Sequence, residues 1–173
     1  MSLQIRTGLP EDALAVARVH HESRRAAYGR MIPEHLLQAF DEEERVRRWR
    51  AWLSDPECVT LLGERDGELV GFCTIGPSRD PDADERTVAE MPTLYVAPGR
   101  WRRGFGRALC AEACRRAADL GFHTLTLWVL DPNTRAKRFY EAFGFVADGA
   151  TKMDDGPIPS SLLARRYRLE LGR

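Results

Sequence analysis

The sequence predicts a mixed α/β fold in which antiparallel and parallel strands share one sheet. Strand-like runs at residues 59–65 and 68–75 flank Asp66-Gly67, a pair that favours a two-residue hairpin turn because it accepts positive φ at little cost. Residues 91–130 read as strand, helix and strand, the order in which two strands pair in parallel. We therefore expect an antiparallel hairpin in the first half of the chain and a parallel pair in the second.

The N-terminal part of the chain reads as one strand followed by helices. Residues 3–7 alternate weakly as a strand, and apolar residues recur at helical spacing once Pro10 has opened the first turn. A second helical region opens near Pro33 and breaks at Asp41. This break predicts two short helices, with Asp41 capping the second one and Glu44 reaching back to the cap.

Breakers and periodicity divide the rest of the chain. Residues 76–90 show neither the helical nor the strand period, and their charges and breakers predict a loop. Gly121 ends the helix that precedes the second parallel strand. The remaining elements are expected as a strand at 91–96, a helix at 105–120, a strand at 124–130, a helix at 134–143, a strand from 145, a loop at 154–161 and a strand at 163–171.

Composition restricts the class of protein. At 173 residues the chain has the length of one typical domain, so we expect a single domain over residues 1–173. Lysine plus arginine and aspartate plus glutamate number 26 each, so no overall field draws the chain to nucleic acid or to an anionic membrane. Neither a membrane-spanning stretch of about 20 apolar residues nor a signal peptide is recognisable, and we expect the protein to be cytoplasmic.

The four cysteines do not predict a metal site or a disulfide. Cys110 and Cys114 share a helical face, but the chain lacks the Cys-x-x-Cys spacing of a zinc site. Small buried helix residues explain the pair in a reducing compartment. We expect no metal and assign these cysteines no chemical role.

Two glycines mark the junction between the strand at 91–96 and the following helix. Gly104 and Gly106 let backbone N–H groups turn toward an anion at the helix N-terminus, where the helix dipole also favours negative charge. The pattern is typical of a pyrophosphate site. A tight strand-to-helix turn without a ligand is the alternative interpretation of the glycines alone.

A second motif makes the first more specific. The segment Asn133-Thr-Arg-Ala-Lys-Arg-Phe-Tyr-Glu-Ala-Phe-Gly-Phe145, together with the glycine loop, resembles the GCN5-related N-acetyltransferase superfamily, and weaker matches cover effectively the whole chain. The resemblance implies a twisted, mostly antiparallel sheet of six to seven strands with helices on both faces. It also implies that the parallel pair at 91–96 and 124–130 splays apart to admit acyl-CoA. The chain departs from the family at Trp101, where glutamine or arginine is usual, and at Arg102, where glycine is frequent.

The resemblance implies acetyl-CoA as cosubstrate and assigns the residues that hold it. Backbone N–H groups of residues 102–107 are expected at the phosphates, and main-chain groups of the first strand of the pair at the acetyl carbonyl and pantetheine. Asn133 is expected either to cap its helix or to bind the pantetheine arm. The cofactor set is therefore Leu94, Tyr95, Val96, Arg102, Arg103, Gly104, Phe105, Gly106, Arg107, Asn133 and Tyr140.

Acyl transfer to an amine needs a proton for the leaving thiolate and a neutral amine. Tyr140 is the expected acid, although an aromatic packing role or simple orientation of the thioester are alternatives. Glu90 is the expected base at the acceptor cleft, with a solvated glutamate as its alternative. Tyr28 is expected to border the acceptor pocket, and His20 is more typical of a packing residue than of a catalytic one.

Two functions remain open from the sequence. One is an N-acetyltransferase that transfers acetyl from acetyl-CoA to a primary amine by direct attack in a ternary complex. The other is a non-catalytic acyl-CoA-binding or sensing module of the same fold. The acceptor is not predicted, and a homodimer is an open expectation because relatives pair through sheet edges.

Overall fold

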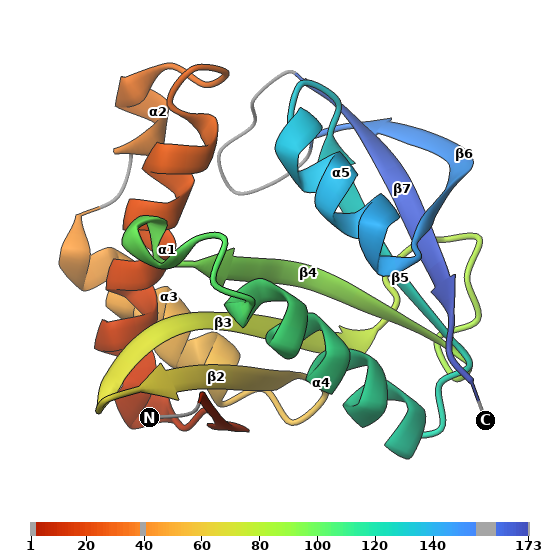
Figure 1. The fold of residues 1–173 in the computed structure, drawn as a ribbon, viewed down its shortest axis with the longest axis horizontal. Helices are drawn as coiled ribbons and strands as arrows, with labels where there is room; N and C mark the ends of the chain where they lie inside the picture. Colours follow the sequence, from red (N-terminus) through yellow and green to blue (C-terminus); the bar gives the residue numbers. More distant parts are fainter. Residues whose placement is uncertain (1–2, 39–40, 155–161, 173) are drawn as a thin grey trace.

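One twisted sheet organises the molecule (Figure 1). The computed structural model describes residues 3–38, 41–154 and 162–172, and within them seven strands form a sheet of order β1-β2-β3-β4-β5-β7-β6. The strands are β1 (Gln4–Thr7), β2 (Val59–Arg65), β3 (Glu68–Pro77), β4 (Val88–Val96), β5 (Thr124–Leu130), β6 (Val146–Met153) and β7 (Leu163–Glu170). The helices are α1 (Ala13–Tyr28), α2 (Glu34–Leu37), α3 (Glu42–Leu53), α4 (Phe105–Asp119) and α5 (Thr134–Phe143), with 3-10 turns at Pro10–Asp12 and Pro98–Arg100.

The strand pairing confirms the predicted fold class. Every neighbouring pair is antiparallel except β4 and β5, which run parallel. The hairpin between β2 and β3 turns at Asp66 and Gly67, whose φ angles of 55° and 79° are the left-handed values that this turn requires. The local sequence signal therefore sets this hairpin.

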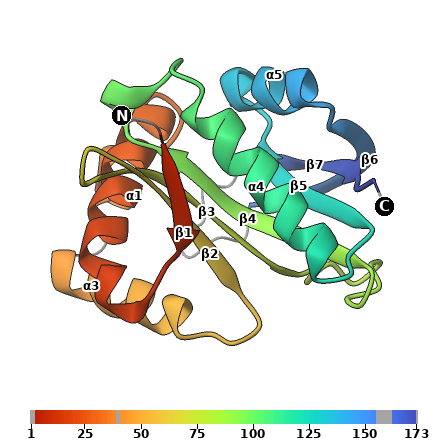
Figure 2. The same cartoon turned by 60° about the horizontal axis from the view of Figure 1, so that its bottom comes forward.

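Helices cover both faces of the sheet (Figure 2). On one face α1 and α3 pack against β2 and β3 in a cluster that includes Val16, Trp49 and Phe72. On the other face α4 and α5 cover a larger cluster around Leu109 and Tyr140. Successive strand residues point to opposite faces, so each central strand contributes to both clusters. No helix in the described part of the chain is long and apolar enough to cross a membrane.

The loop between β3 and β4 is shorter than the sequence predicts. Gly76 pairs with Glu90 and Pro77 with Ala89, so β3 continues to Pro77 and β4 already begins at Val88. Pairing with neighbours on both sides overrides the local breakers and charges there. The expected loop at 154–161 falls outside the described residues from position 155 onward.

The predicted cap of α3 is half correct. Asp41 accepts a hydrogen bond from the Glu44 backbone N–H at 2.8 Å, as the capping pattern predicts. The Glu44 carboxylate, however, pairs with Arg48 one turn further along the helix instead of reaching back to the cap. The helix therefore begins at the predicted place with a simpler cap.

The parallel pair separates soon after it begins. β4 and β5 pair only through Val88 with Thr124, Ala89 with Leu125 and Glu90 with Thr126. The register of β3 and β4 shifts between Thr74 and Gly76, which marks the bulge where β4 turns away. Beyond Glu90 the two strands splay, as the resemblance implies, and the space between them forms the candidate site.

Candidate active site

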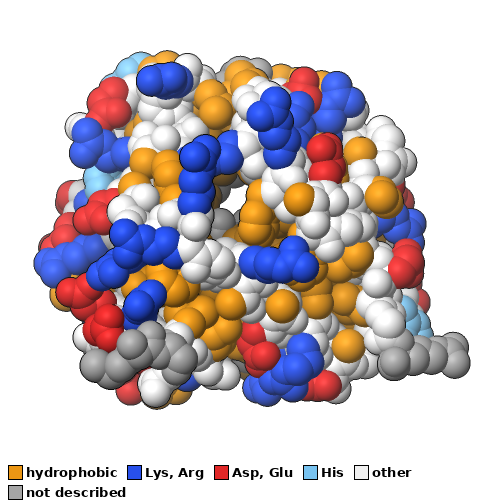
Figure 3. Space-filling model, viewed as in Figure 1, with side chains coloured by type: hydrophobic (Ala, Val, Ile, Leu, Met, Phe, Trp, Pro, Cys, Tyr) orange, Lys and Arg blue, Asp and Glu red, His pale blue; other side chains and the backbone are white. Residues whose placement is uncertain are grey.

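A cavity of about 590 Å³ occupies the splay between β4 and β5. Residues of α1, β4, β5, α4, α5 and the loop before α4 line it. Figure 3 shows the molecule hollowed at the middle of one face, with lysine and arginine side chains around the opening. Of the predicted site residues, the lining includes Tyr28, Leu94, Tyr95, Val96, Arg102, Gly104, Phe105, Gly106, Arg107, Asn133 and Tyr140.

The main chain of β4 faces this cavity at alternate residues. Hydrogen-bonded and non-bonded pairs alternate along an antiparallel ladder, and the Ala97 N–H bonds the Val70 carbonyl at 2.9 Å. Counting back from that pair, Tyr95 turns its main-chain groups toward β3. Leu94 and Val96 turn theirs into the splay, where β5 no longer pairs with them.

One of these main-chain groups is already occupied. The Val96 carbonyl accepts hydrogen bonds from the Trp101 indole N–H at 2.7 Å and from the Ser23 hydroxyl at 3.0 Å. Two donors fill the two lone pairs of that oxygen. Sequence reasoning assigned main-chain roles to residues 94–96 alike, but the structure leaves the Val96 N–H and both groups of Leu94 for a ligand. The departure from the family pattern at Trp101 therefore has a structural role.

The glycine loop gives α4 an N-terminus suited to an anion. Gly104 is the N-cap residue with φ of 82°, and Arg102 before it is also left-handed with φ of 60°. The first backbone bond of α4 runs from the Ala108 N–H to the Gly104 carbonyl. The N–H groups of the intervening residues 105–107 therefore have no partner within the helix and are available to a ligand in the cavity that these residues line. A tight strand-to-helix turn without a ligand, the alternative interpretation of the glycines, does not require unpaired N–H groups beside a large cavity.

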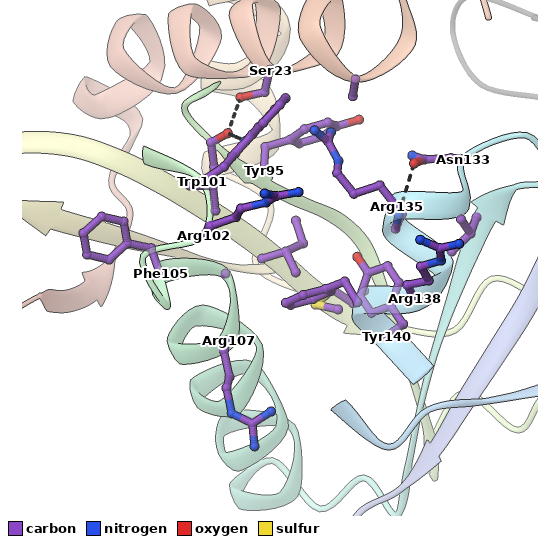
Figure 4. A pocket seen from close by; sticks show the side chains of 18 of the residues that line it. Ser23, Tyr95, Trp101, Arg102, Phe105, Arg107, Asn133, Arg135, Arg138 and Tyr140 are labelled. Carbon is purple, nitrogen blue, oxygen red and sulfur yellow. Dashed lines mark hydrogen bonds between the residues drawn. The ribbon is translucent and has the colours of Figure 1, made fainter. Parts of the chain in front are cut away.

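Arginines add positive charge to the same cavity (Figure 4). Arg102 and Arg107 line it as expected, whereas Arg103 is exposed and lies outside the lining. Sequence reasoning missed Arg135 and Arg138, which line the cavity from α5 at the i, i+3 spacing of one helical face. Of the five arginines in the lining, Arg100 pairs with Glu68, and the other four, at positions 102, 107, 135 and 138, form no ion pair with a carboxylate among the described residues. The cavity therefore favours a ligand with several negative charges.

Tyr140 places a hydroxyl in the apolar depth of the cavity. It is buried between Phe139 and Phe145, whose rings meet it edge to face at 5.1 and 5.5 Å between centroids. Burial is the largest cause that raises the pKa of Tyr140 well above its usual value, so the hydroxyl keeps its proton at neutral pH. Figure 4 shows this hydroxyl directed into the cavity. The structure thus combines the predicted packing role with an available donor.

Asn133 caps α5 through its side-chain oxygen. The oxygen accepts a hydrogen bond from the Ala136 N–H at 3.1 Å, which confirms the capping interpretation. The side chain is buried and lines the cavity, so its amide N–H₂ group remains available to a ligand. The interpretation that Asn133 also binds pantetheine stays a prediction.

Glu90 is not among the residues that line the cavity, so the structure does not bring it together with the other predicted site residues, and its role as a base and acceptor ligand stays a prediction. Its buried carboxylate accepts hydrogen bonds from Arg79 Nε at 3.1 Å and Nη2 at 3.0 Å. It lies on the part of β4 that is still paired with β5, outside the cavity lining. Sequence reasoning missed Arg79 because it stands in the segment that was expected to be a loop. Within the described residues, no aspartate, glutamate or histidine lines the cavity.

His20 is a packing residue, as the sequence favours. Its Nδ1 accepts a hydrogen bond from the Trp49 indole N–H at 3.2 Å, and the rings of Trp49 and Tyr95 meet it edge to face. Burial lowers the pKa of His20 to about 3. Tyr28 lines the cavity from the last residue of α1, next to Tyr95.

The four cysteines are free thiols, and Cys110 and Cys114 lie one turn apart on α4. No group of three or more possible metal ligands occurs in the part of the chain that the structure describes.

A splayed parallel pair, a helix N-terminus suited to an anion and a buried tyrosine hydroxyl are the features expected of an acyltransferase that uses acyl-CoA. Residues 17–145 match the model of the Acetyltransferase (GNAT) family, and the chain belongs to this family. In the family the acyl donor is acetyl-CoA. The sequence resemblance and its fold are thus confirmed.

Individual relatives agree with this assignment. The chain is 29% identical to the uncharacterized N-acetyltransferase YuaI of Bacillus subtilis (strain 168) over 139 residues, covering 80% of this chain and 78% of YuaI. PaiA N-acetyltransferase from Thermoplasma acidophilum, in complex with coenzyme A, has a TM-score of 0.75 at 22% identity, covering 98% of this chain and 100% of that one. The yncA structure from Salmonella typhimurium, with its cofactor acetyl-CoA, has a TM-score of 0.72 at 20% identity, covering 100% of this chain and 96% of that one. These two structures share the fold.

Proposed function

We propose that this protein transfers the acetyl group of acetyl-CoA to a primary amine by direct attack of the amine within a ternary complex. The observation that carries the proposal is the Tyr140 hydroxyl, which is protonated and directed into the same splay as the free main-chain groups of Leu94. Family membership and the coenzyme A complexes of the two solved structures support the donor.

The residues of the cavity fit coenzyme A along its length. The N–H groups of residues 105–107 suit the pyrophosphate, and Arg102 and Arg107 add charge-assisted donors beside them. The Val96 N–H and the Asn133 amide suit the amide groups of pantetheine. In the splay the ligand thus takes the place of a neighbouring strand and pairs with the free edge of β4.

Bound acetyl-CoA supplies the acetyl group as a thioester, and the chain's own groups act on its polar atoms. The Leu94 N–H is placed to bond the acetyl oxygen as negative charge develops there. The Tyr140 hydroxyl donates a hydrogen bond to the departing sulfur. Its pKa lies above the value of about 8.5 for a thiol, so the hydroxyl stabilises the thiolate, and any proton it passes on is replaced by one that the attacking nitrogen loses. An amide and a free thiol result.

Glu90 has no part in this scheme because Arg79 holds its carboxylate outside the cavity. The amine therefore attacks in its neutral form without help from that residue. Tyr28 borders the side of the cavity that α1 covers, where we place the acceptor.

The test is release of free thiol from acetyl-CoA across a broad panel of amines, with mass confirmation of the acetylated product. A hit that is lost in Tyr140→Phe while acetyl-CoA binding persists supports the proposal. Binding of acetyl-CoA without acetylation of any amine by the unmodified protein would instead support the non-catalytic module.

A further inference from the structure

One arginine of the cavity is held in place before any ligand arrives. The Arg135 guanidinium lies flat over the Trp101 indole, with its central carbon 3.7 Å from the ring centroid. Trp101 is itself fixed through its N–H bond to the Val96 carbonyl at 2.7 Å. Arg135 comes from α5 and Trp101 from the loop before α4, so the two side chains meet across the splay (Figure 4). Stacking uses the face of the guanidinium and leaves the N–H donors at its edge for a ligand.

The charge of Arg135 is not neutralised by the described part of the protein. Its pKa is lowered, first by burial and further by the nearby Arg102 cation. Arg100, which also lines the cavity, differs because its guanidinium bonds the Glu68 carboxylate at 2.7 Å. A stacked guanidinium cation without a carboxylate partner is suited to bind an anion.

A second guanidinium stands on the same side. Arg24, one turn before Tyr28 on α1, has its central carbon 5.9 Å from the Tyr28 ring centroid. The Arg24 Nε is buried and has no hydrogen-bond partner among the described atoms. Tyr28, Tyr95 and Arg135 all line the cavity, and Arg24 lies beside the Tyr28 ring, so positive charge gathers on the side of the cavity that α1 covers. Figure 4 shows Arg135 reaching toward the α1 side of the cavity, whereas Phe105 and Arg107 of α4 lie on the opposite side, with Arg102 between them.

We propose that Arg135, with Tyr28 beside it in the cavity lining, binds a carboxylate of the acceptor, so that the acceptor is an amine bearing a carboxylate, such as a free α-amino acid. Arg24 adds positive charge from outside the lining. The inference rests on the proposed N-acetyltransferase function. The cofactor phosphates already have the N–H groups of residues 105–107 and the Arg107 side chain on the α4 side. An anion beneath α1 therefore belongs to the molecule that enters from the Tyr28 side.

The experiment compares matched amines on the full chain. α-Amino acids and their carboxamides, such as L-phenylalanine with L-phenylalaninamide and L-methionine with L-methioninamide, are assayed by thiol release. We expect kcat/KM to be at least about tenfold higher for the acids, the usual size of one charge-assisted contact. The amine of the carboxamide is less basic than that of the acid, so a larger share of it is neutral. Protonation of the amine therefore does not explain a preference for the acid. Arg135→Gln should reduce the ratio to near one through KM for the acid, with KM for acetyl-CoA unchanged.

Arg138→Gln is the matched control because it removes another unpaired arginine from the same face of α5. It should leave the ratio of acid to carboxamide intact, whatever it does to KM for acetyl-CoA. Equal use of acids and carboxamides by the unmodified protein would overturn the inference and leave the proposed function standing. A rise only in KM for acetyl-CoA in Arg135→Gln would also overturn it and assign the guanidinium to the cofactor phosphates. Failure to acetylate any amine would refute the function itself.

Discussion

The two halves of β4 differ in what their neighbours leave free. From Val88 to Glu90 the strand pairs with β3 on one side and β5 on the other, and its one acidic side chain is held by Arg79. From Thr93 to Val96 it pairs with β3 alone, and the main-chain groups of Leu94 and Val96 face a cavity. The same strand is therefore structural in its first half and available for chemistry in its second.

The comparison teaches that the reactive groups lie where pairing stops. A buried main-chain donor without a partner costs free energy, and a ligand that supplies the partner recovers it. The N–H groups of Leu94 and Val96 and those of residues 105–107 are unpaired donors of residues that line the same cavity. The Glu90 side chain, in the paired half of β4, does not line the cavity.

Tyr140→Phe tests the free half most strongly. Removing the hydroxyl should lower kcat by about 10² to 10⁴, the usual contribution of a positioned proton donor. The ring and its two aromatic contacts remain, so calorimetry should find acetyl-CoA affinity within about threefold of the unmodified value. A kcat within a few-fold of the unmodified protein would remove Tyr140 from the mechanism.

Gly104→Ala tests the glycine loop. At φ of 82° an alanine is strained by about 1–2 kcal/mol, and relaxation of the loop would move the N–H groups away from the anion. We expect acetyl-CoA affinity to fall about tenfold. Gly121→Ala is the matched control, since Gly121 has φ of 93° and equally open surroundings at the other end of α4. It should cost similar stability without changing affinity, and equal affinity losses in both variants would contradict the assignment.

His20 tests the packed side of β4, where it touches Tyr95. The folded state holds its pKa near 3, below the unfolded value, so the unfolded state binds the extra proton as the pH falls. The free energy of unfolding should therefore decrease below about pH 6.5, by up to about 1.4 kcal/mol per pH unit from this group.

Urea denaturation at pH 5 and pH 7.5 measures that loss. His20→Asn should show a smaller difference between the two pH values than the unmodified protein. His35→Asn, at an exposed position on α2, should leave the difference unchanged. A His20 variant with the full pH dependence would show that this histidine is not held neutral.

Glu90→Gln should have the smallest effect on catalysis. Because the carboxylate is tied to Arg79 outside the cavity, we expect kcat/KM and its pH profile to change less than about threefold. Loss of the ion pair should cost about 1 kcal/mol of stability, read from urea denaturation. A loss of activity of 100-fold or more would restore Glu90 as the base and refute the division between the two halves.

The parts of this site that the sequence predicted are those that depend on local signals. The Asp66-Gly67 turn, the glycine loop, the Asn133 cap and the helix that carries Tyr140 depend on residues close in the chain, and the structure contains each of them. The resemblance added the splay, which no local pattern shows. The ion pair of Glu90 was missed because it joins β4 to a segment without a readable period.

The Trp101 and Arg135 contact was missed for a related reason. The two residues are far apart in sequence, and stacking has no spacing rule that would connect them. The occupied Val96 carbonyl follows from the same tryptophan, which the sequence showed only as a departure from the family pattern. Besides the strand ends between Gly76 and Glu90, long-range side-chain contacts were therefore the unpredictable part.

The structure of the protein with bound coenzyme A tests the central claim most directly. We predict that the ligand lies in the splay, with its phosphates at the N–H groups of residues 105–107 and its sulfur within hydrogen-bond distance of the Tyr140 hydroxyl. Its pantetheine should bond the main chain of Leu94 and the Val96 N–H while Trp101 keeps the Val96 carbonyl. Coenzyme A bound outside the splay, or with its sulfur beside Glu90, would contradict the account.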